Sequence, residues 1–571
     1  MRTLAFLLTF TSLVFAQEGR FVPTGKLTTP RESHAAILLK DGRVLITGGI
    51  QQDQLNKTTY LATAELYDPV TGTFRPTGSM LQPHYLHVST LLADGRVLIA
   101  GGFAQGNAPP PAELYDPASG SFSPAGIPTA KESIAGVHAI LLPTGKVLLT
   151  GLAGLYDPAN QSFTSLGKID SNSGAVLLPD GRLVATSYDS VSLYDLKSDS
   201  VTLLDKKPLG SSWLHRTTTL LSDGSVLIAG GDWDYGEQTT WEALVYNPRD
   251  RSTKTTGILL IARDSHRSIL LPGGQVLVID GYNSDGYSSG QCCIAEAELY
   301  DPVDGQFHAA ALDIDTRQGH TATLLQDGRV LVTGGRGRQS ASLYIPQLRA
   351  TSAASPAPAL APGSLASLFG SQLASVAESA NLAALPISLG GSGVKIRDGS
   401  GTEYWARLLF ASPTQLNFEM PPAVQPGGLT ITVSGSGGSL AATGGMLTPV
   451  APALFTFDGR TPAAYALRYE PDGKTTVVST SDPIALDSRP VYLTLYATGL
   501  RNRTSLATVQ CEIGGVNVPI DYAGPEGSGI PGLDQVNLRL PASLRGCGIV
   551  DLTLTVDGFR SNVVTLEFAN P

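Results

Sequence analysis

Residues 34–346 of this chain repeat one short sequence unit seven times, and this repeat limits the possible folds more than any other feature. One copy reads HAAILLKDGRVLITGG and begins at His34, and another reads HTATLLQDGRVLVTGG and begins at His320. The second residue of the central turn is a glycine in every copy, with a mean period of about 48 residues. These glycines are Gly42, Gly95, Gly145, Gly181, Gly224, Gly274 and Gly328. A repeat of this period indicates a fold that is built from repeated structural units.

Each copy predicts four short antiparallel strands. An Asp-Gly or Gly-Gly pair joins the first two strands, and such pairs favour the tight turns of β-hairpins. A third strand carries a Leu-Tyr-Asp-Pro type motif, as in residues 65–69, and a fourth follows a short turn, as in residues 71–78. The 63 glycines and 38 prolines suit a chain with many tight turns. Seven units of four strands predict a seven-bladed β-propeller, an all-β fold.

The seventh unit ends at its third strand, and its missing partner is found at the other end of the repeat region. The sequence GRFVPTG at residues 19–25 matches GTFRPTG at residues 72–78, where the fourth strand of the first unit lies. We therefore expect the N-terminal strand to complete the last blade and close the ring, which also protects sheet edges that would otherwise be open.

With the glycine pair, the spaced Tyr and the recurring His in register, residues 19–348 resemble a kelch-repeat β-propeller. The fourth unit departs from the pattern, because Ala185 and Thr186 replace the glycine pair and Ser173 replaces the His. No unit has the Trp that is usual in the family. The resemblance implies a ring-shaped scaffold whose loops carry the function.

Kelch propellers followed by an immunoglobulin-like domain also occur in copper-radical oxidases of the galactose oxidase type. That family requires a Tyr-His dipeptide, a Tyr crosslinked to Cys, and a copper-binding His from the C-terminal domain. This sequence has no Tyr-His dipeptide and no histidine after His320. We therefore expect the propeller architecture without its copper site, with no metal and no cofactor.

The C-terminal part contains a weaker internal duplication. LFGSQL at residues 368–373 resembles LYATGL at residues 495–500, and three further pairs of segments follow in the same order at offsets of 120–124 residues. This predicts two immunoglobulin-like β-sandwich modules, residues 364–455 and 456–571, after a linker at residues 349–363 that is either extended or the first edge of the next domain. The region resembles a duplicated C-terminal domain of exported soil-bacterial proteins, which implies export but no active site.

The first residues predict a secretory signal peptide, residues 1–16, with cleavage near Ala16. Its apolar run of about 13 residues is too short to span a bilayer, and no other stretch of the sequence is long and apolar enough. We expect a secreted or periplasmic protein with the propeller at residues 17–348. The net charge of -10, with no basic run, argues against nucleic acid as a partner. We also expect a monomer.

The four cysteines form two candidate pairs. Cys511 and Cys547 both lie in segments that we expect to be strands, and a disulfide between them is plausible after export, with two buried thiols as the alternative. Cys292 and Cys293 are adjacent and could form a vicinal disulfide or remain free. No further Cys or nearby His completes a metal-binding set around them.

Six of the eight histidines share one position of the sequence repeat, namely His34, His87, His138, His215, His266 and His320. A ring of metal ligands is one interpretation. We favour packing between blades, because a residue that repeats with the blade points in a different direction in each one. The segment that begins at Asp232 resembles a calcium loop only loosely, since its acidic end falls at Glu242 and not at residue 243.

The strand order places all the variable loops on one face of the ring. Three of the four tryptophans lie in or beside the fifth unit on this face, together with carboxylates and tyrosines. The candidate ligand-binding residues are Trp213, Asp232, Trp233, Asp234, Tyr235, Trp241, Tyr282, Asp285 and Tyr287. Aromatic faces beside carboxylates suit sugar rings, whereas the same residues could simply pack the loops.

We therefore expect an exported, non-enzymatic binding or adhesion protein that recognises an extracellular glycan or protein on this face. The alternative is a carbohydrate-active hydrolase, lyase or isomerase at the propeller mouth, with carboxylates and an arginine such as Arg336 or Arg338. A carboxylate pair with perturbed pKa values in a deep pocket would favour the enzyme.

Overall fold

The structure is a computed structural model of the 571-residue chain. It describes residues 19–53, 57–104, 110–128, 138–150, 154–165, 174–186, 190–196, 200–206, 213–233, 238–283, 294–313, 315–435, 438–470 and 472–570. Within these ranges the regular structure is β strand, apart from two single-turn 3-10 helices, η1 (Leu506–Thr508) and η2 (Ala542–Leu544). The expected all-β class is confirmed. No helix in the described part of the chain is both long and apolar enough to cross a membrane.

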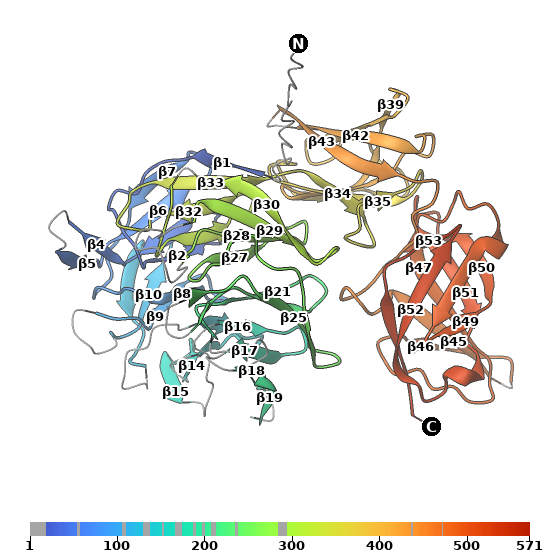
Figure 1. Ribbon diagram of the computed structural model, residues 1–571, viewed down its shortest axis with the longest axis horizontal. Helices are drawn as coiled ribbons and strands as arrows, with labels where there is room; N and C mark the ends of the chain where they lie inside the picture. Colours follow the sequence, from blue (N-terminus) through green and yellow to red (C-terminus); the bar gives the residue numbers. More distant parts are fainter. Residues whose placement is uncertain are drawn as a thin grey trace, which may run out of the picture.

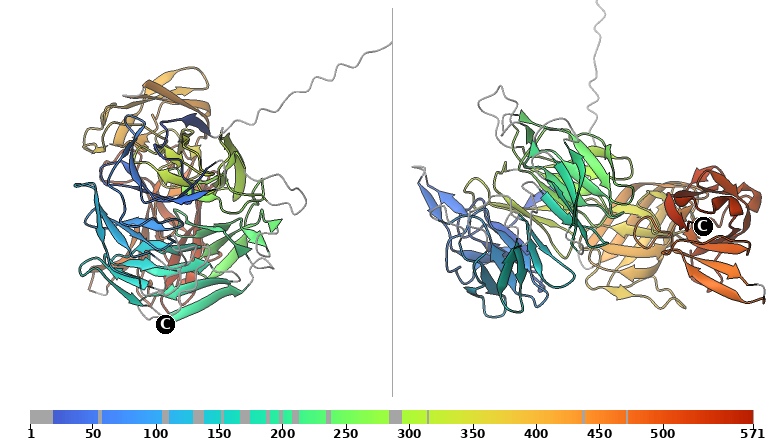
Figure 2. Two further views of the ribbon diagram at one scale, coloured as in Figure 1. Left: turned by 90° about the vertical axis from the view of Figure 1, so that its left-hand side faces the viewer. Right: turned by 90° about the horizontal axis from the view of Figure 1, so that it is seen from below.

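Seven four-stranded antiparallel sheets lie in the described part of residues 19–346, and we call them blades 1 to 7 (Figures 1 and 2). Blade 1 contains β2 (Ala35–Leu38), β3 (Val44–Thr47), β6 (Ala64–Asp68) and β7 (Thr73–Pro76). Blade 2 contains β8 (Val88–Leu91), β9 (Val97–Ala100), β10 (Glu113–Asp116) and β11 (Ser121–Pro124). Blade 3 contains β12 (Ala139–Leu141), β13 (Val147–Leu149), β14 (Gly154–Asp157) and β15 (Ser162–Ser165).

The remaining blades follow the same order along the chain. Blade 4 contains β16 (Gly174–Leu177), β17 (Arg182–Thr186), β18 (Ser190–Asp195) and β19 (Ser200–Lys206). Blade 5 contains β21 (Thr217–Leu220), β22 (Val226–Ala229), β25 (Ala243–Asn247) and β26 (Ser252–Thr255). Blade 6 contains β27 (Arg267–Leu270), β28 (Val276–Ile279), β29 (Glu296–Asp301) and β30 (Gln306–Leu312). Blade 7 contains β31 (Thr321–Leu324), β32 (Val330–Thr333), β33 (Ala341–Pro346) and β1 (Gly19–Pro23).

Tight turns join the first two strands of each blade. The seven turn glycines that the sequence repeat identified have φ angles between 79° and 94°. This is the left-handed region, which glycine enters without the steric cost that a Cβ atom adds. The glycine at this position is therefore required by the turn.

Among the described residues, the apolar core of the ring is divided among seven clusters, each of which joins two neighbouring blades. Leu148 of blade 3 packs with Leu183 of blade 4, for example, and Tyr67 of blade 1 packs with Leu331 of blade 7. Because the last cluster joins blade 7 to blade 1, the sheets form a closed β-propeller.

The N-terminal strand completes blade 7, as the sequence predicts. β1 pairs antiparallel with β33 and places Phe21 opposite Tyr344. The corresponding pair in blade 1 is Phe74 opposite Tyr67. The two ring pairs have centroid distances of 5.3 and 4.7 Å, so β1 occupies the same place in blade 7 as β7 does in blade 1.

Buried ion pairs fasten the connections between blades to the sheets. Glu65 in β6 accepts hydrogen bonds from two backbone N–H groups of the connection before β2 and pairs with Arg31 at 2.7 Å. Glu298 in β29 accepts two equivalent N–H groups from the connection before β27 and pairs with Arg263 at 2.5 Å. Neither arginine is exposed, so each carboxylate neutralises a buried guanidinium and also holds the connection in place.

Two facing sheets that share one core follow the propeller, and we call them sandwich 1. One sheet contains β34 (Arg349–Ser352), β36 (Leu365–Phe369), β41 (Gln415–Glu419), β40 (Arg407–Ala411) and β37 (Glu378–Ser379). The other contains β35 (Ala359–Leu360), β43 (Gly438–Leu447), β42 (Gly427–Gly435), β38 (Gly393–Asp398) and β39 (Glu403–Trp405). Residues 349–363 thus contain two strands, because β34 pairs with β36 in one sheet and β35 pairs with β43 in the other. Part of the expected linker is therefore the first edge of the sandwich.

A second pair of sheets, which we call sandwich 2, surrounds its own core. One sheet contains β46 (Thr475–Ser479), β45 (Ala464–Tyr469), β47 (Val491–Thr498), β51 (Asp534–Arg539) and β50 (Ile520–Pro525), with β44 (Ala453–Leu454) beside β47. The other contains β49 (Val516–Val518), β48 (Val509–Ile513), β52 (Gly548–Val556) and β53 (Phe559–Arg560), with β54 (Val564–Phe568) beside β52.

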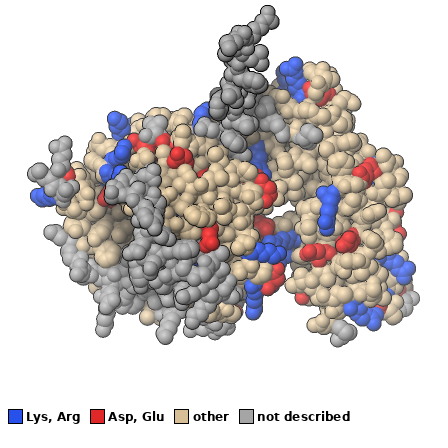
Figure 3. Space-filling model, in the orientation of Figure 1, with Lys and Arg blue, Asp and Glu red and all other residues tan. Residues whose placement is uncertain are grey.

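Ion pairs join the propeller to both sandwiches. Arg349 of sandwich 1 contacts Asp301 of blade 6 at 2.5 Å. Arg460 of sandwich 2 contacts Asp223 in the turn between the first two strands of blade 5 at 2.8 Å, and Arg249 of the same blade pairs with Asp458. Figure 3 shows basic and acidic side chains meeting where the propeller approaches sandwich 2.

The expected disulfide between Cys511 and Cys547 is wrong, because both thiols are free. Cys511 is buried in β48 directly opposite Leu554 of β52, whereas Cys547 is exposed just before β52 begins. Cys547 precedes Leu554, the residue opposite Cys511, by seven positions. Extended chain rises about 3.3 Å per residue, so the two cysteines are too far apart to form a disulfide. The predicted signal peptide and the pair Cys292 and Cys293 lie outside the described residues.

Candidate functional site

A small three-stranded sheet on blade 5 brings several predicted ligand-binding residues together. It contains β20 (Trp213–Leu214), β23 (Asp232–Trp233) and β24 (Gln238–Thr239). β20 precedes the innermost strand of the blade, and β23 and β24 belong to the connection between β22 and β25. The backbone register places Trp213 opposite Trp233 and Leu214 opposite Asp232. This sheet lies on the variable-loop face.

A histidine and two carboxylates form the polar centre of this region. The Nδ1 atom of His215 lies 3.1 Å from Oδ1 of Asp232. The side chain of Asp232 is only 2 % exposed, whereas that of His215 is 58 % exposed and can reach a ligand. Asp264 is buried in the connection before blade 6, and the N–H of its neighbour Ser265 donates to the carbonyl of His215 at 3.3 Å. Blades 5 and 6 therefore meet at this cluster.

The environment of the cluster raises two pKa values. The hydrogen bond to Asp232 raises the pKa of His215, and the negative charges of Asp232 and Asp264 raise it further. Burial raises the pKa of the Asp264 carboxyl to about 6, and the nearby charge of Asp232 adds to this effect. Two titratable side chains with raised pKa values, His215 and Asp264, thus lie close together, an arrangement that occurs often at functional sites.

His215 does not occupy the repeat position that we assigned to it. It has a φ of 55°, and its counterparts in other blades are the residues just before the buried histidines. These left-handed residues are Ser33, Leu86, His215, Ser265 and Gly319. Arg216 takes the buried position in blade 5, so His215 is displaced by one residue onto the surface.

The histidines that do occupy the repeat position are His34, His87, His266 and His320, and all four are buried. His34 lies 3.0 Å from the hydroxyl of Thr321 in blade 7, and His266 lies 2.8 Å from that of Thr217 in blade 5. Burial lowers the pKa of both histidines. Packing between blades, the interpretation that we favoured, therefore describes these residues, although His138 and His215 are not among them.

The other predicted residues are distributed unevenly. Tyr282 forms an isolated β-bridge with Asp264 and so lies beside the cluster. Trp241 is 54 % exposed and follows β24 in the same connection. Arg338 pairs with Asp315 at 2.8 Å in blade 7, away from the elements that carry the cluster. Asp234, Tyr235, Asp285 and Tyr287 lie outside the described residues.

Sequence reasoning missed His215 and Asp264 as members of the site, although spacing gives a signal for one of them. His34, His87, His266 and His320 each precede the turn glycine by eight residues. His215 precedes Gly224 by nine, which places it one position away from the buried register. For Asp264 no sequence signal was available, because its importance comes from burial beside Asp232.

The described part of the chain contains no clustered set of metal ligands. No group of three His, Cys, Asp or Glu side chains in these residues is placed to hold a metal ion. His320 lies 3.6 Å from Asp280, and both side chains are fully buried. This pair lies between blades 6 and 7 and has no third potential ligand among the described residues.

No protein-family model matches the sequence. No curated protein matches it significantly. Solved structures do match, and one of them is a fungal alcohol oxidase of the AA5 family in complex with copper. That structure is 15 % identical to this chain with a TM-score of 0.49, and the match covers 76 % of this chain and 100 % of that chain.

Proposed function

We propose that this chain is an exported binding or adhesion protein that recognises an extracellular glycan or protein on the variable-loop face, with a glycan favoured. The observation that carries the proposal is the His215–Asp232 pair, in which a buried carboxylate orients an exposed imidazole. Such a pair offers directed hydrogen bonds to sugar hydroxyls, and the exposed ring of Trp241 on the same connection offers an apolar face.

The scaffold of this proposal is a kelch-type propeller followed by two immunoglobulin-like modules. The seven sheets with their glycine turns support the first part, and the two cores of the C-terminal region support the second. Cleavage near Ala16 would leave the mature N-terminus just before β1. Mass spectrometry of the protein after secretion from a bacterial host tests the cleavage, since we expect a mature chain that begins at Gln17.

The binding site is tested by glycan-array screening followed by calorimetry with the best ligand. We expect His215→Ala to lower the affinity about tenfold or more, because hydrogen bonds to charged groups contribute about 1.5–3 kcal/mol. The matched control is His308→Ala, which removes an exposed histidine from β30, the outer strand of blade 6. The Nε2 atom of His308 lies 2.9 Å from Oδ2 of Asp304, so it belongs to another His–Asp pair. Equal losses in both variants, or no loss in either, would contradict the assignment.

A second candidate function is acid–base catalysis on a glycan at the same cluster. It is favoured by one observation, the pKa of about 6 for Asp264 beside a histidine whose pKa is raised. The test is release of reducing ends or of unsaturated products from bound glycans between pH 4 and 8. Turnover that is lost in Asp264→Asn while binding remains would establish the enzyme; binding without turnover in the unchanged protein would exclude it.

A further inference from the structure

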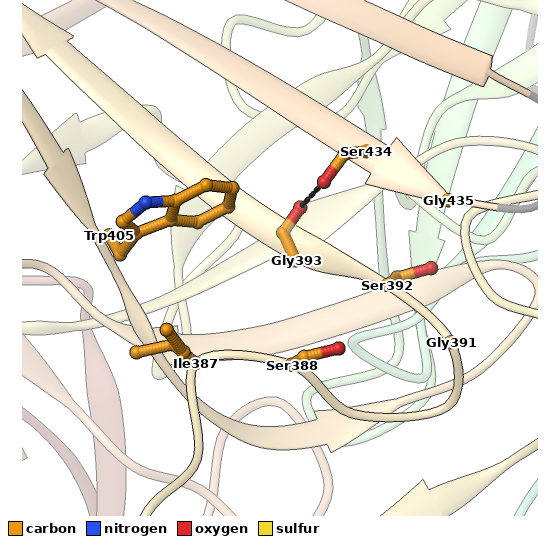
Figure 4. A pocket seen from close by; sticks show the side chains of 8 residues that line it. All are labelled: Ile387, Ser388, Gly391, Ser392, Gly393, Trp405, Ser434 and Gly435. Atoms are coloured by element: carbon orange, nitrogen blue, oxygen red, sulfur yellow. Dashed lines mark hydrogen bonds between the residues drawn. The ribbon is translucent and has the colours of Figure 1, made fainter.

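Two hollows lie along one sheet of sandwich 1, far along the chain from the propeller site. In β38 the side chains of Val394 and Ile396 enter the core, so Lys395 and Arg397 face outward. The first hollow has a volume of about 360 Å³, and its lining residues are Ile387, Ser388, Gly391, Ser392, Gly393, Trp405, Ser434 and Gly435 (Figure 4). The second, of about 560 Å³, is lined by Arg397, Asp398, Gly399, Gly401, Gly428, Leu429, Thr430 and Gly445.

Trp405 forms the aromatic wall of the first hollow. It lies in β39 opposite Lys395, and its side chain is 47 % exposed. The ring lies over Gly393, where an added Cβ would be 3.0 Å from Cζ3 of the indole. The ammonium group of Lys395 lies 5.2 Å from the ring centroid and pairs with Glu403 at 3.1 Å. The indole therefore lies against Gly393 with the ammonium group of Lys395 over the ring, and Trp405 as a whole remains 47 % exposed, so a sugar that stacks on the ring shares it with Lys395.

The rest of the hollow is polar but uncharged. The exposed hydroxyl of Ser388 has no hydrogen-bond partner among the described residues, and the Ser434 hydroxyl makes only a 3.5 Å contact with the carbonyl of Gly393. No Asp, Glu, Lys or Arg lines this hollow. This uncharged lining favours a neutral ligand with one apolar face for the indole and hydroxyl groups for the serines. These are the properties of a sugar ring.

We propose that this face of sandwich 1 binds a neutral polysaccharide, with one sugar ring stacked on Trp405. The strand register connects the two hollows, because Gly393 pairs with Ser434 at one end of β38 and Arg397 pairs with Thr430 toward the other. A glycan chain that stacks on Trp405 passes Lys395 and reaches the second hollow, where Arg397 can donate hydrogen bonds to neutral hydroxyl groups and Asp398 can accept them. The site is separate from the propeller cluster, and neither proposal depends on the other.

The dimensions favour a glycan over a folded protein as the occupant. A volume of 360 Å³ falls within the roughly 300–1,000 Å³ of small-ligand sites. A stable protein partner would instead need about 800 Å² of complementary surface, with a dry apolar centre. Here glycine and serine supply six of the eight lining residues, so the apolar surface is limited to Trp405 and Ile387.

The test is affinity electrophoresis of the full mature chain in native gels that contain a neutral polysaccharide, namely β-glucan, galactomannan or arabinoxylan. We expect at least one of them to retard the protein. Trp405→Ala should then weaken binding about tenfold, which corresponds to about 1.4 kcal/mol of aromatic contact. Trp405→Phe should keep most of the affinity, and Gly393→Ala should weaken binding because its methyl group displaces the indole.

The matched control is Phe559→Ala, which removes an aromatic side chain that is 40 % exposed from β53 of sandwich 2, outside both proposed sites, and should leave this retardation unchanged. Melting temperatures show whether each variant is folded, and Ser388→Ala offers a second, surface-only change that should also weaken binding. The proposal is overturned if no polysaccharide retards the unchanged protein, or if folded Trp405→Ala and Ser388→Ala bind as well as it does. Loss of binding in His215→Ala alone would also overturn this site while supporting the propeller site.

Discussion

The propeller and sandwich 2 are both built from antiparallel strands, but they divide their buried apolar side chains differently. In sandwich 2 one continuous core joins strands from both sheets, and Leu493, Leu554 and Phe568 all belong to it. In the propeller each cluster joins only two neighbouring blades. A ring made of separate small cores needs other contacts to hold it, and the buried Arg–Glu pairs and the closing strand β1 supply them.

The largest expected effect comes from removing that closing strand. Deletion of residues 19–23 leaves β33 without its outer neighbour and removes Phe21 from the side of Tyr344. We expect a loss on the order of the whole stability of a typical domain, roughly 5–15 kcal/mol, for the propeller alone. Calorimetry should then show no propeller transition beside an unchanged transition for sandwich 2. Survival of both transitions would mean that the ring does not depend on β1.

The buried ion pairs should be the next most sensitive part of the ring. Arg263→Ala leaves the carboxylate of Glu298 buried and unpaired, so we expect a destabilisation of about 3–5 kcal/mol in urea unfolding. Arg338→Ala is the control, because its pair with Asp315 is partly exposed and should contribute at most about 1 kcal/mol. Similar effects in both variants would contradict a special role for the buried pair.

The continuous core of sandwich 2 allows the opposite experiment. Leu493→Ala creates a cavity in that core and should destabilise it by about 2–5 kcal/mol. We expect the sandwich 2 transition to move to lower temperature in calorimetry while the propeller transition keeps its position. A matching shift of the propeller transition would show that the two regions unfold as one unit.

The propeller site should make stability depend on pH in a defined direction. Burial raises the pKa of Asp264 from 3.8 to about 6, so between these values the folded chain holds a proton that the unfolded chain has lost. The contribution of Asp264 to stability therefore rises as the pH falls through 6 and is complete near 4. Asp264→Asn should be more stable than the unchanged protein at pH 7.5, by up to roughly 3 kcal/mol. Urea titrations should show that this gain disappears at pH 4; a gain that is constant with pH would exclude the titration.

The smallest effect concerns the contact between the two regions. Arg249 pairs with Asp458, and its Nη1 donates to the Thr565 hydroxyl at 2.7 Å. These side chains are partly exposed, so Arg249→Ala should cost about 1 kcal/mol or less. Limited proteolysis should show faster cleavage between the propeller and sandwich 2, with little change in either melting temperature. An unchanged cleavage rate would show that this pair does not couple the two regions.

The fold was largely predictable because its determinants are local in sequence. Turn glycines such as Gly42 need a left-handed φ, and the match between Phe21 and Phe74 identified the closing strand.

The site was predictable only in part. Asp232 and Tyr282 were identified from the aromatic and acidic residues of the variable loops. Asp264 matters because it is buried near Asp232, which lies 32 positions earlier, and no local sequence pattern reveals this. The prediction of a disulfide between Cys511 and Cys547 failed for a similar reason, because the register of β48 on β52 separates the two thiols.

The pairing of β1 with β33 also constrains how the chain can be made. Residue 19 must find residue 346, so the ring has no complete seventh blade until about three fifths of these 571 residues have been synthesised. Closing so long a loop is entropically costly and slow compared with forming each hairpin. The six earlier blades can form their own sheets first. The first strand to emerge is therefore among the last to find its place, and until then it must stay extended and unpaired without associating with another chain.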